Sequence, residues 1–166
     1  MTIRTLTDLY VDQLQDLYSA NKQSLDVTKA MQREATSPEL KDALTEGVKG
    51  ISQGMEQVKQ LIEQRDANPN GEFCRGMEGL TREARAHAID AEIADKDVRD
   101  ASIIAQYQRM AHYAMAGYGT AAAFAERLGR ERDTHVLRTC LEQTRSGDHR
   151  LTGIAVGQIN KEAVAA

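Results

Sequence analysis

The sequence predicts an all-α fold, a four-helix bundle with one long crossover connection. Apolar residues recur at helical spacing along four long segments of the 166-residue chain, and no segment alternates as a strand would. The only two prolines, Pro38 and Pro69, lie between these segments, so each helix can run without a break. A chain of this length can bury a core of its own, and we expect a single domain spanning residues 1–166.

The first two helices are expected over residues 6–34 and about 38–64. In the first, Tyr10, Leu14 and Leu17 are spaced so that they fall on one face of a helix. The second begins at Ser37-Pro38, because serine is a favoured N-cap and proline suits the first helical position. The two helices are therefore joined by a short turn.

The second half of the chain begins with a cluster of helix breakers over residues 66–71. This cluster opens a long connection that carries a short helix at about residues 76–87. The next long helix starts near Asp95 or Asp97 and ends at Gly129. We expect it to bend or bulge near Gly117 and Gly119, since glycine weakens a helix interior. The last helix is expected over about residues 132–160.

The order of these elements predicts an up-down, ferritin-like topology. Four long helices with a single crossover between the second and third are the arrangement of ferritin-like bundles, and the short extra helix lies on that crossover. Such bundles commonly hold metal ions near the middle, so the inner helix faces are the place to look for chemistry.

Composition excludes several classes of function. The net charge of −4 argues against a nucleic-acid-binding protein, which would normally be basic. The longest uncharged run, residues 110–125, is shorter than the ~18–20 residues that a membrane-spanning helix needs. The N-terminal residues show no apolar signal core, and Cys74 and Cys140 have no metal-type spacing. We expect a cytoplasmic protein with no membrane partner.

The inner faces near mid-helix carry few metal ligands. Ferritin-like di-metal proteins project glutamates and histidines into the bundle centre from all four helices. Here these faces carry Asn21 on the first helix, Gly47, Gly50 and Gly54 on the second, Ala111 and Ala114 on the next, and Thr144 and Asp148 on the last. Asp148 is a suitable ligand and His112 lies close by, but one carboxylate and one imidazole cannot neutralise two metal ions.

The chain resembles the YciE/YciF family of bacterial ferritin-like proteins along nearly its whole length. The segments that carry the resemblance are residues 16–20 (Asp-Leu-Tyr-Ser-Ala), 74–80 (Cys-Arg-Gly-Met-Glu-Gly-Leu), 98–101 (Val-Arg-Asp-Ala), 112–113 with 117–120 (His-Tyr and Gly-Tyr-Gly-Thr), and 151–152 (Leu-Thr). The resemblance implies a ferritin-like bundle that is usually dimeric, a link to stress responses, and a carboxylate-rich di-metal site in many members.

The same resemblance implies that the metal site is degenerate. Relatives commonly carry Glu at five positions that are Asn21, Gly50, Ala111, Ala114 and Thr144 in this chain, whereas Asp148 and Glu78 match the family pattern. We therefore expect the five former-site positions to meet at mid-bundle and to bind no metal. The residual candidate ligands are Asp148, His112 and Glu78.

Other residues carry further expectations. Asp148 is expected to be held by Asn21, Thr144 or a tyrosine hydroxyl, and His112 to be a core or interface histidine. The space above the glycines should be filled by large residues such as Tyr18, Tyr107 or Met110. Cys140 is expected to be a small core residue. Cys74 begins the short helix, where partial exposure and a lowered pKa would allow a redox role.

The functional hypothesis is a non-catalytic, ferritin-like structural or interaction protein related to the bacterial stress response, without a cofactor. The alternative is a di-iron or di-manganese oxidase or peroxide-handling protein that uses displaced ligands. We expect a homodimer, because Leu9, Val11 and Ile104 offer more apolar surface than one helix seam needs. The sequence does not identify a protein partner.

Overall fold

The computed structural model describes residues 3–164, so the first two and last two residues of the expected domain lie outside it. Four long α-helices form the bundle: α1 (Leu6–Glu34), α2 (Pro38–Glu63), α4 (Lys96–Arg127) and α5 (Glu131–Ile154). No strand occurs over residues 3–164, which confirms the all-α prediction. None of the helices in this range is both long and apolar enough to cross a membrane.

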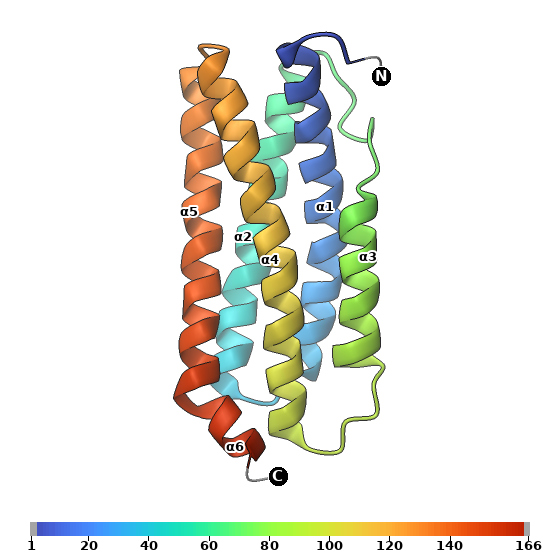
Figure 1. The fold of residues 1–166 in the computed structure, drawn as a ribbon, viewed down its shortest axis with the longest axis vertical. Coiled ribbons are helices and arrows are strands. Elements are labelled where there is room, and N and C mark those ends of the chain that lie inside the picture. The colour runs from blue at the N-terminus through green and yellow to red at the C-terminus, as the bar shows by residue number, and fades with distance from the viewer. Residues whose placement is uncertain (1–2, 165–166) are drawn as a thin grey trace.

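The four long helices are arranged as the crossover connection requires (Figure 1). Helix α1 runs down the bundle in that view, α2 and α4 run up, and α5 runs down again. The closest helix pairs are α1 with α2, α4 with α5, α1 with α4 and α2 with α5. Each of these neighbouring pairs is antiparallel, so the chain must travel the full length of the bundle between α2 and α4.

The crossover carries the short helix that the sequence predicts. Helix α3 (Arg75–Ala84) packs against α1 and α4, outside the four-helix core (Figure 1). It is followed by a π-helical turn, η1 (Arg85–Ile89), which the sequence did not reveal. Cys74 caps the start of α3, because its Sγ accepts a hydrogen bond from the Met77 amide at 3.3 Å.

Helix ends follow the capping signals in the sequence. Thr5 and Asp8 form a reciprocal capping box at the start of α1. Ser37 accepts a hydrogen bond from the Leu40 amide, and Pro38 occupies the first position of α2, as expected. Between α4 and α5, Gly129 adopts a φ of +69°, a left-handed conformation that glycine reaches without strain.

Two expectations about helix continuity are wrong. Helix α4 runs as an α-helix through Gly117 and Gly119 without a bulge. The glycine at 117 instead leaves room for Leu17, whose Cδ2 lies 2.6 Å from the place that a Cβ on Gly117 would occupy. The last helix ends earlier than expected, at Ile154, and continues as a π-helical turn η2 (Ala155–Ile159) and a short helix α6 (Asn160–Val164).

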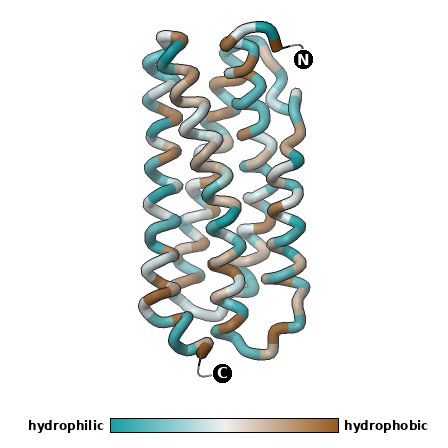
Figure 2. Tube along the Cα trace, viewed as in Figure 1, coloured by the Kyte–Doolittle hydropathy of each residue, from teal (hydrophilic) through white to brown (hydrophobic). Residues whose placement is uncertain are grey.

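The buried core has two apolar halves, one towards each end of the bundle. One half includes Met31, Leu40, Leu44 and Ile103, near the turn between α1 and α2. The other half includes Tyr10, Leu14, Val58, Ile62 and Leu137, near the opposite end. Figure 2 shows the hydropathy of each residue along the helices. The two halves leave the middle of the bundle to smaller and more polar side chains.

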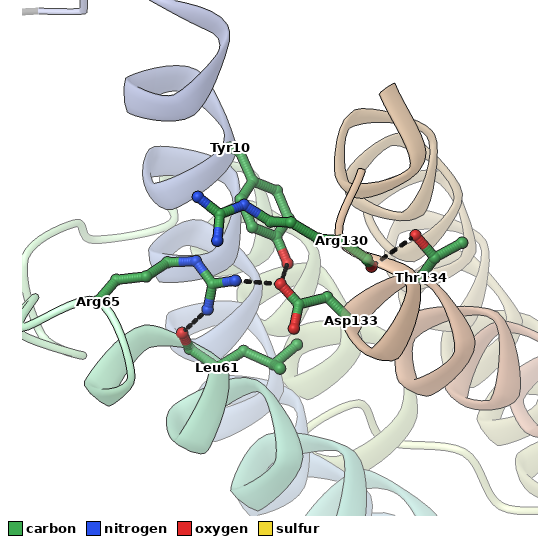
Figure 3. Close-up of polar contacts among 6 residues, drawn as sticks. All are labelled: Tyr10, Leu61, Arg65, Arg130, Asp133 and Thr134. Atoms are coloured by element: carbon green, nitrogen blue, oxygen red, sulfur yellow. Dashed lines mark hydrogen bonds and ion pairs between the residues drawn. The ribbon is translucent and has the colours of Figure 1, made fainter. Parts of the chain in front are cut away.

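A buried charged cluster holds the end of the bundle where α1 begins (Figure 3). The Asp133 carboxylate accepts a hydrogen bond from the Tyr10 hydroxyl at 3.1 Å and pairs with the Arg65 guanidinium. Arg65 also donates to the Leu61 carbonyl and lies over the Tyr10 ring, 5.1 Å from its centroid. This cluster joins α1, α5 and the end of α2, so it fixes three helices at one point.

Candidate functional site

The middle of the bundle contains a cavity of about 390 Å³ between the two apolar halves. All four long helices line it: α1 contributes Asn21, Ser24 and Thr28; α2 residues 43–53 include Gly47 and Gly50; α4 contributes Tyr107, Met110, Ala111, Ala114 and Tyr118; and α5 residues 140–151 include Thr144 and Gly147. The structure thus brings Asn21, Gly50, Ala111, Ala114 and Thr144 together around one space.

The inner wall of the cavity is held by neutral hydrogen bonds. Asn21 donates from Nδ2 to the Tyr118 hydroxyl at 2.8 Å, and both side chains are buried. Ser24 donates from its hydroxyl to the Asn21 carbonyl at 3.1 Å. On the facing helix, the Thr144 hydroxyl donates to the Cys140 carbonyl at 2.8 Å. These contacts need no charge, so the centre is stable as an assembly of uncharged groups.

The three glycines of α2 meet three different surroundings. A Cβ on Gly47 would lie 2.6 Å from the Tyr107 hydroxyl, and a Cβ on Gly54 would lie 2.5 Å from the Tyr118 hydroxyl. A Cβ on Gly50 would meet nothing within 4 Å. Tyr107 therefore fills the space above a glycine as expected, and Tyr118 does so without having been predicted.

Burial keeps the two tyrosine hydroxyls protonated. Burial, and secondarily the Asp148 carboxylate, raises the pKa of Tyr107 to about 12. Burial is also the main cause of the raised pKa of Tyr118, with the Cys140 thiol adding to it. Both phenols thus face the cavity as neutral donors and acceptors at physiological pH.

Residues 5–164 match the family described as Domain of unknown function DUF892. The chain belongs to this family. Protein YciF of Escherichia coli strain K12 is 32% identical over 164 residues, which is 98% of each chain. The crystal structure of that stress protein superimposes with a TM-score of 0.88 at 31% identity and covers 96% of this chain and 99% of its own. The resemblance to the YciE/YciF family is therefore confirmed.

Two further solved structures are similar to this DUF892 chain. YcfI from Rhodopseudomonas palustris, for which a structural role has been suggested, is 33% identical and has a TM-score of 0.83; the match covers 90% of this chain and 94% of that one. A protein from Xanthomonas campestris pv. campestris has a TM-score of 0.72 at 19% identity, covering 97% and 95% of the two chains. This last likeness shows the shared fold alone.

Two of the three residual candidate ligands of this DUF892 chain lie together, and the third lies apart. Asp148 accepts a hydrogen bond from Gln108 at 3.1 Å and lies 3.4 Å from Nε2 of His112. The expected partners of Asp148 were wrong, because Asn21 bonds Tyr118 and Thr144 bonds a carbonyl. His112 is also not a core residue, since 66% of its side chain is exposed.

Glu78 lies elsewhere. It is in the first turn of α3, on the crossover, and it does not line the cavity. Asp148 and His112 form a pair on the seam between α4 and α5, and neither lines the cavity. Glu78 is therefore separated from the Asp148–His112 pair, and within residues 3–164 the three candidate ligands do not form one site.

The cavity does not fit two metal ions. Within the part of the chain that the structure describes, Glu46 is the one carboxylate that lines it, and this residue is exposed and pairs with Lys49 at 2.8 Å. Among residues 3–164, no three His, Cys, Asp or Glu side chains come close enough together to hold an ion. The amide, hydroxyl and alanine groups that meet at the centre cannot balance the charge of two divalent cations.

The cysteines are both free and buried. Cys74 was expected to be partly exposed with a lowered pKa, and both points are wrong. Only 1% of it is exposed, and burial raises the pKa of its thiol. Its Sγ lies 3.0 Å from the Tyr113 hydroxyl, which donates to Asp16 at 3.0 Å. Cys140 is a core residue as expected, and its thiol donates to Gln57 at 2.9 Å.

The apolar residues that suggested a dimer surface are largely covered within one chain. Val11 and Ile104 are only 8% and 2% exposed, and Leu9 is half-buried. Ile104 belongs to the same apolar half of the core as Met31 and Ile103. Val11 and Ile104 therefore offer little apolar surface to a partner copy, and the homodimer stays a prediction from the family resemblance.

Proposed function

We propose that this protein acts in the bacterial stress response through binding or structural interactions, as a ferritin-like bundle without a metal centre. The observation that carries the proposal is the composition of the cavity. The five positions at which the family resemblance implies glutamate lie around one space, and their side chains are neutral. The kinship with YciF, a stress protein of Escherichia coli, supports the physiological setting.

The geometry favours this interpretation over a di-metal oxidase. An oxidase would need Asp148, His112 and Glu78 near one another, and these residues occupy the α4–α5 seam and the crossover helix. The buried lining of the cavity is uncharged, so it would not offset the charge that two cations bring into the bundle.

Metal content tests the proposal. The protein is purified from cells grown with added iron and manganese, passed through gel filtration, and measured by plasma mass spectrometry. We expect far less than one ion of either metal per chain, and a melting temperature that neither chelator nor added Fe²⁺ or Mn²⁺ changes. Two retained ions per chain, or a saturable rise in melting temperature that Asp148→Ala abolishes, would favour the oxidase.

The assembly and location remain predictions. The family resemblance leads us to propose a homodimer, and the charge and composition of the chain lead us to propose that it is cytoplasmic and binds neither nucleic acid nor membranes. Light scattering at micromolar concentrations should give about twice the mass of the 18.3 kDa chain. A monomer at these concentrations would contradict the proposed dimer and would leave the proposal of a bundle without metal unchanged.

A further inference from the structure

The cavity opens between α2 and α5. Its lining residues on α1 and α4 are buried or half-buried, whereas the α2 and α5 residues Glu46, Lys49, Gln53, Gln143, Ser146 and Arg150 are exposed. Two glycines line the cavity on these helices, Gly50 on α2 and Gly147 on α5. A Cβ on either glycine would meet nothing within 4 Å. A small molecule can therefore enter from solvent without displacing a side chain at these positions.

The interior holds polar groups that lack partners. Thr28 is fully buried and lines the cavity, yet its hydroxyl has no hydrogen-bond partner among the described residues. The Tyr107 hydroxyl likewise makes no hydrogen bond within residues 3–164, in contrast with Tyr118, which Asn21 engages. A fully buried hydroxyl without a partner, such as that of Thr28, is unfavourable, and the Tyr107 hydroxyl lines the cavity without a hydrogen bond, so an incoming hydrogen-bonding group would be stabilised there.

The chemistry of the wall defines what fits. The buried lining combines apolar groups, such as Met110, Ala111 and Leu151, with neutral amide and hydroxyl groups. The charged lining residues Glu46, Lys49 and Arg150 are all exposed, at the mouth. Because an unpaired charge is costly to bury, the part of a ligand that enters must be uncharged.

We infer that this cavity binds an uncharged, mainly apolar small molecule of about bicyclic-ring size that carries one hydroxyl or carbonyl group. The volume is within the usual range of ligand pockets, and an apolar cavity of less than half this size accepts benzene. The polar group would bond the Tyr107 hydroxyl, while the rings pack on Met110, Ala111 and Leu151. The inference rests on the proposed function, because a metal centre would claim the same space.

Fluorescence of 2-naphthol tests the inference directly. The chain has no tryptophan, so the probe can be excited where the protein does not absorb. In water the excited naphthol loses its proton and emits as naphtholate, whereas in a site without free water it emits as the neutral form. We expect a saturable gain of neutral-form emission, with a Kd between about ten micromolar and one millimolar. The matched anion 2-naphthalenesulfonate should bind at least about tenfold more weakly.

Two variants locate the probe. Gly50→Leu places a side chain in the opening and should weaken binding at least about tenfold, whereas Gly153→Leu, an exposed glycine of α5 with equally open surroundings, should leave it unchanged. Tyr107→Phe should weaken 2-naphthol about fivefold and leave 2-methylnaphthalene, which lacks the hydroxyl, unaffected. Melting curves of each variant show that it is folded.

Each alternative result has a definite meaning. No saturable binding up to the solubility of the probe, equal binding to Gly50→Leu, or equal affinity for the sulfonate would overturn the inference. The titrations are run with and without chelator. Binding that chelator abolishes would show a metal in the cavity and contradict the proposed function as well, whereas absence of binding in both conditions would refute the ligand alone.

Discussion

The Tyr107 hydroxyl lies 2.6 Å from the position that a Cβ on Gly47 would take. The aromatic ring crosses from α4 to α2, so the missing side chain on α2 and the large one on α4 occupy one volume between them. Tyr118 and Gly54 repeat the relationship. Between these two pairs, a Cβ on Gly50 would meet nothing within 4 Å, and this gap is part of the cavity.

Substituting the glycines should therefore separate their roles. Gly50→Ala is expected to stabilise the protein by about 1 kcal/mol, because alanine favours the helix and meets nothing within 4 Å. Gly54→Ala should destabilise it by about 1–3 kcal/mol, since Tyr118 is buried and held by Asn21 and has little room to move. Urea unfolding measures both. Equal changes of the same sign would contradict the assignment of different surroundings.

Removing the Tyr118 partner of the Asn21–Tyr118 hydrogen bond should lower the free energy of unfolding, because both side chains are buried. Tyr118→Phe removes the hydroxyl and leaves the buried Asn21 amide without its acceptor, so we expect a loss of about 1–3 kcal/mol in the free energy of unfolding. Asn21→Leu in the same background replaces the orphaned amide by an apolar group of similar size and should recover part of this loss. A double-mutant cycle with no coupling would show that the bond contributes nothing.

The buried ion pair at the end of the bundle gives a larger effect. Asp133→Ala leaves the Arg65 guanidinium and the Tyr10 hydroxyl without their shared acceptor, and we expect a loss of about 3 kcal/mol or more. The exposed pair Arg138–Glu126, at 2.8 Å, provides the control. Glu126→Ala should cost less than about 1 kcal/mol, because solvent already screens that pair. Similar losses in thermal or urea unfolding would count against a buried cluster.

Much of this architecture is encoded locally. The first helix begins and ends where the sequence predicts, at Leu6 and Glu34, and the Ser37-Pro38 start of the second is confirmed. Capping side chains act on amides within a few residues, so they can be recognised without the fold. The grouping of Asn21, Gly50, Ala111, Ala114 and Thr144 was also predictable, because helical periodicity and equal depth along four helices place them.

The residues whose surroundings the sequence did not predict are placed by contacts that helical periodicity does not encode. Asp133 and Tyr10 are 123 positions apart, and no local pattern pairs them. Cys74 is buried because the start of α3 lies against α1 and α4, where its amide donates to the Ser19 hydroxyl and its Sγ contacts the Tyr113 hydroxyl, so its burial follows from where α3 lies. His112 was placed near the seam correctly, but a small rotation of α4 decides whether that position faces the core or solvent, and it faces solvent.

Stability should fall at high pH because of Cys140. Burial raises the pKa of its thiol from an ordinary value of 9.0 to about 11. Below about pH 9 the thiol is protonated in both the folded and unfolded states and has no effect. Between about pH 9 and 11 only the unfolded chain releases the proton, so the free energy of unfolding should fall by about 3 kcal/mol. Urea midpoints across this range should fall more steeply for the natural protein than for Cys140→Ser.

Restoring the acids at the centre should convert the bundle to one that responds to metal. A variant with Glu in place of Asn21, Gly50, Ala111, Ala114 and Thr144 gathers five carboxylates in the space of about 390 Å³. Mutual repulsion and burial should raise their pKa values, so this variant should be less stable than the natural protein at neutral pH and regain stability as the pH falls and the carboxyls bind protons.

Added Mn²⁺ should oppose that repulsion. We expect a saturable rise of several degrees in the melting temperature of the five-glutamate variant, reversed by chelator, and no change in the natural protein under the same conditions. If the variant is unfolded without metal at neutral pH, circular dichroism should show helix returning on addition of Mn²⁺. A folded variant whose melting temperature ignores both pH and Mn²⁺ would mean that the five positions do not share one space, and the argument from the cavity to a lost metal centre would fail with it.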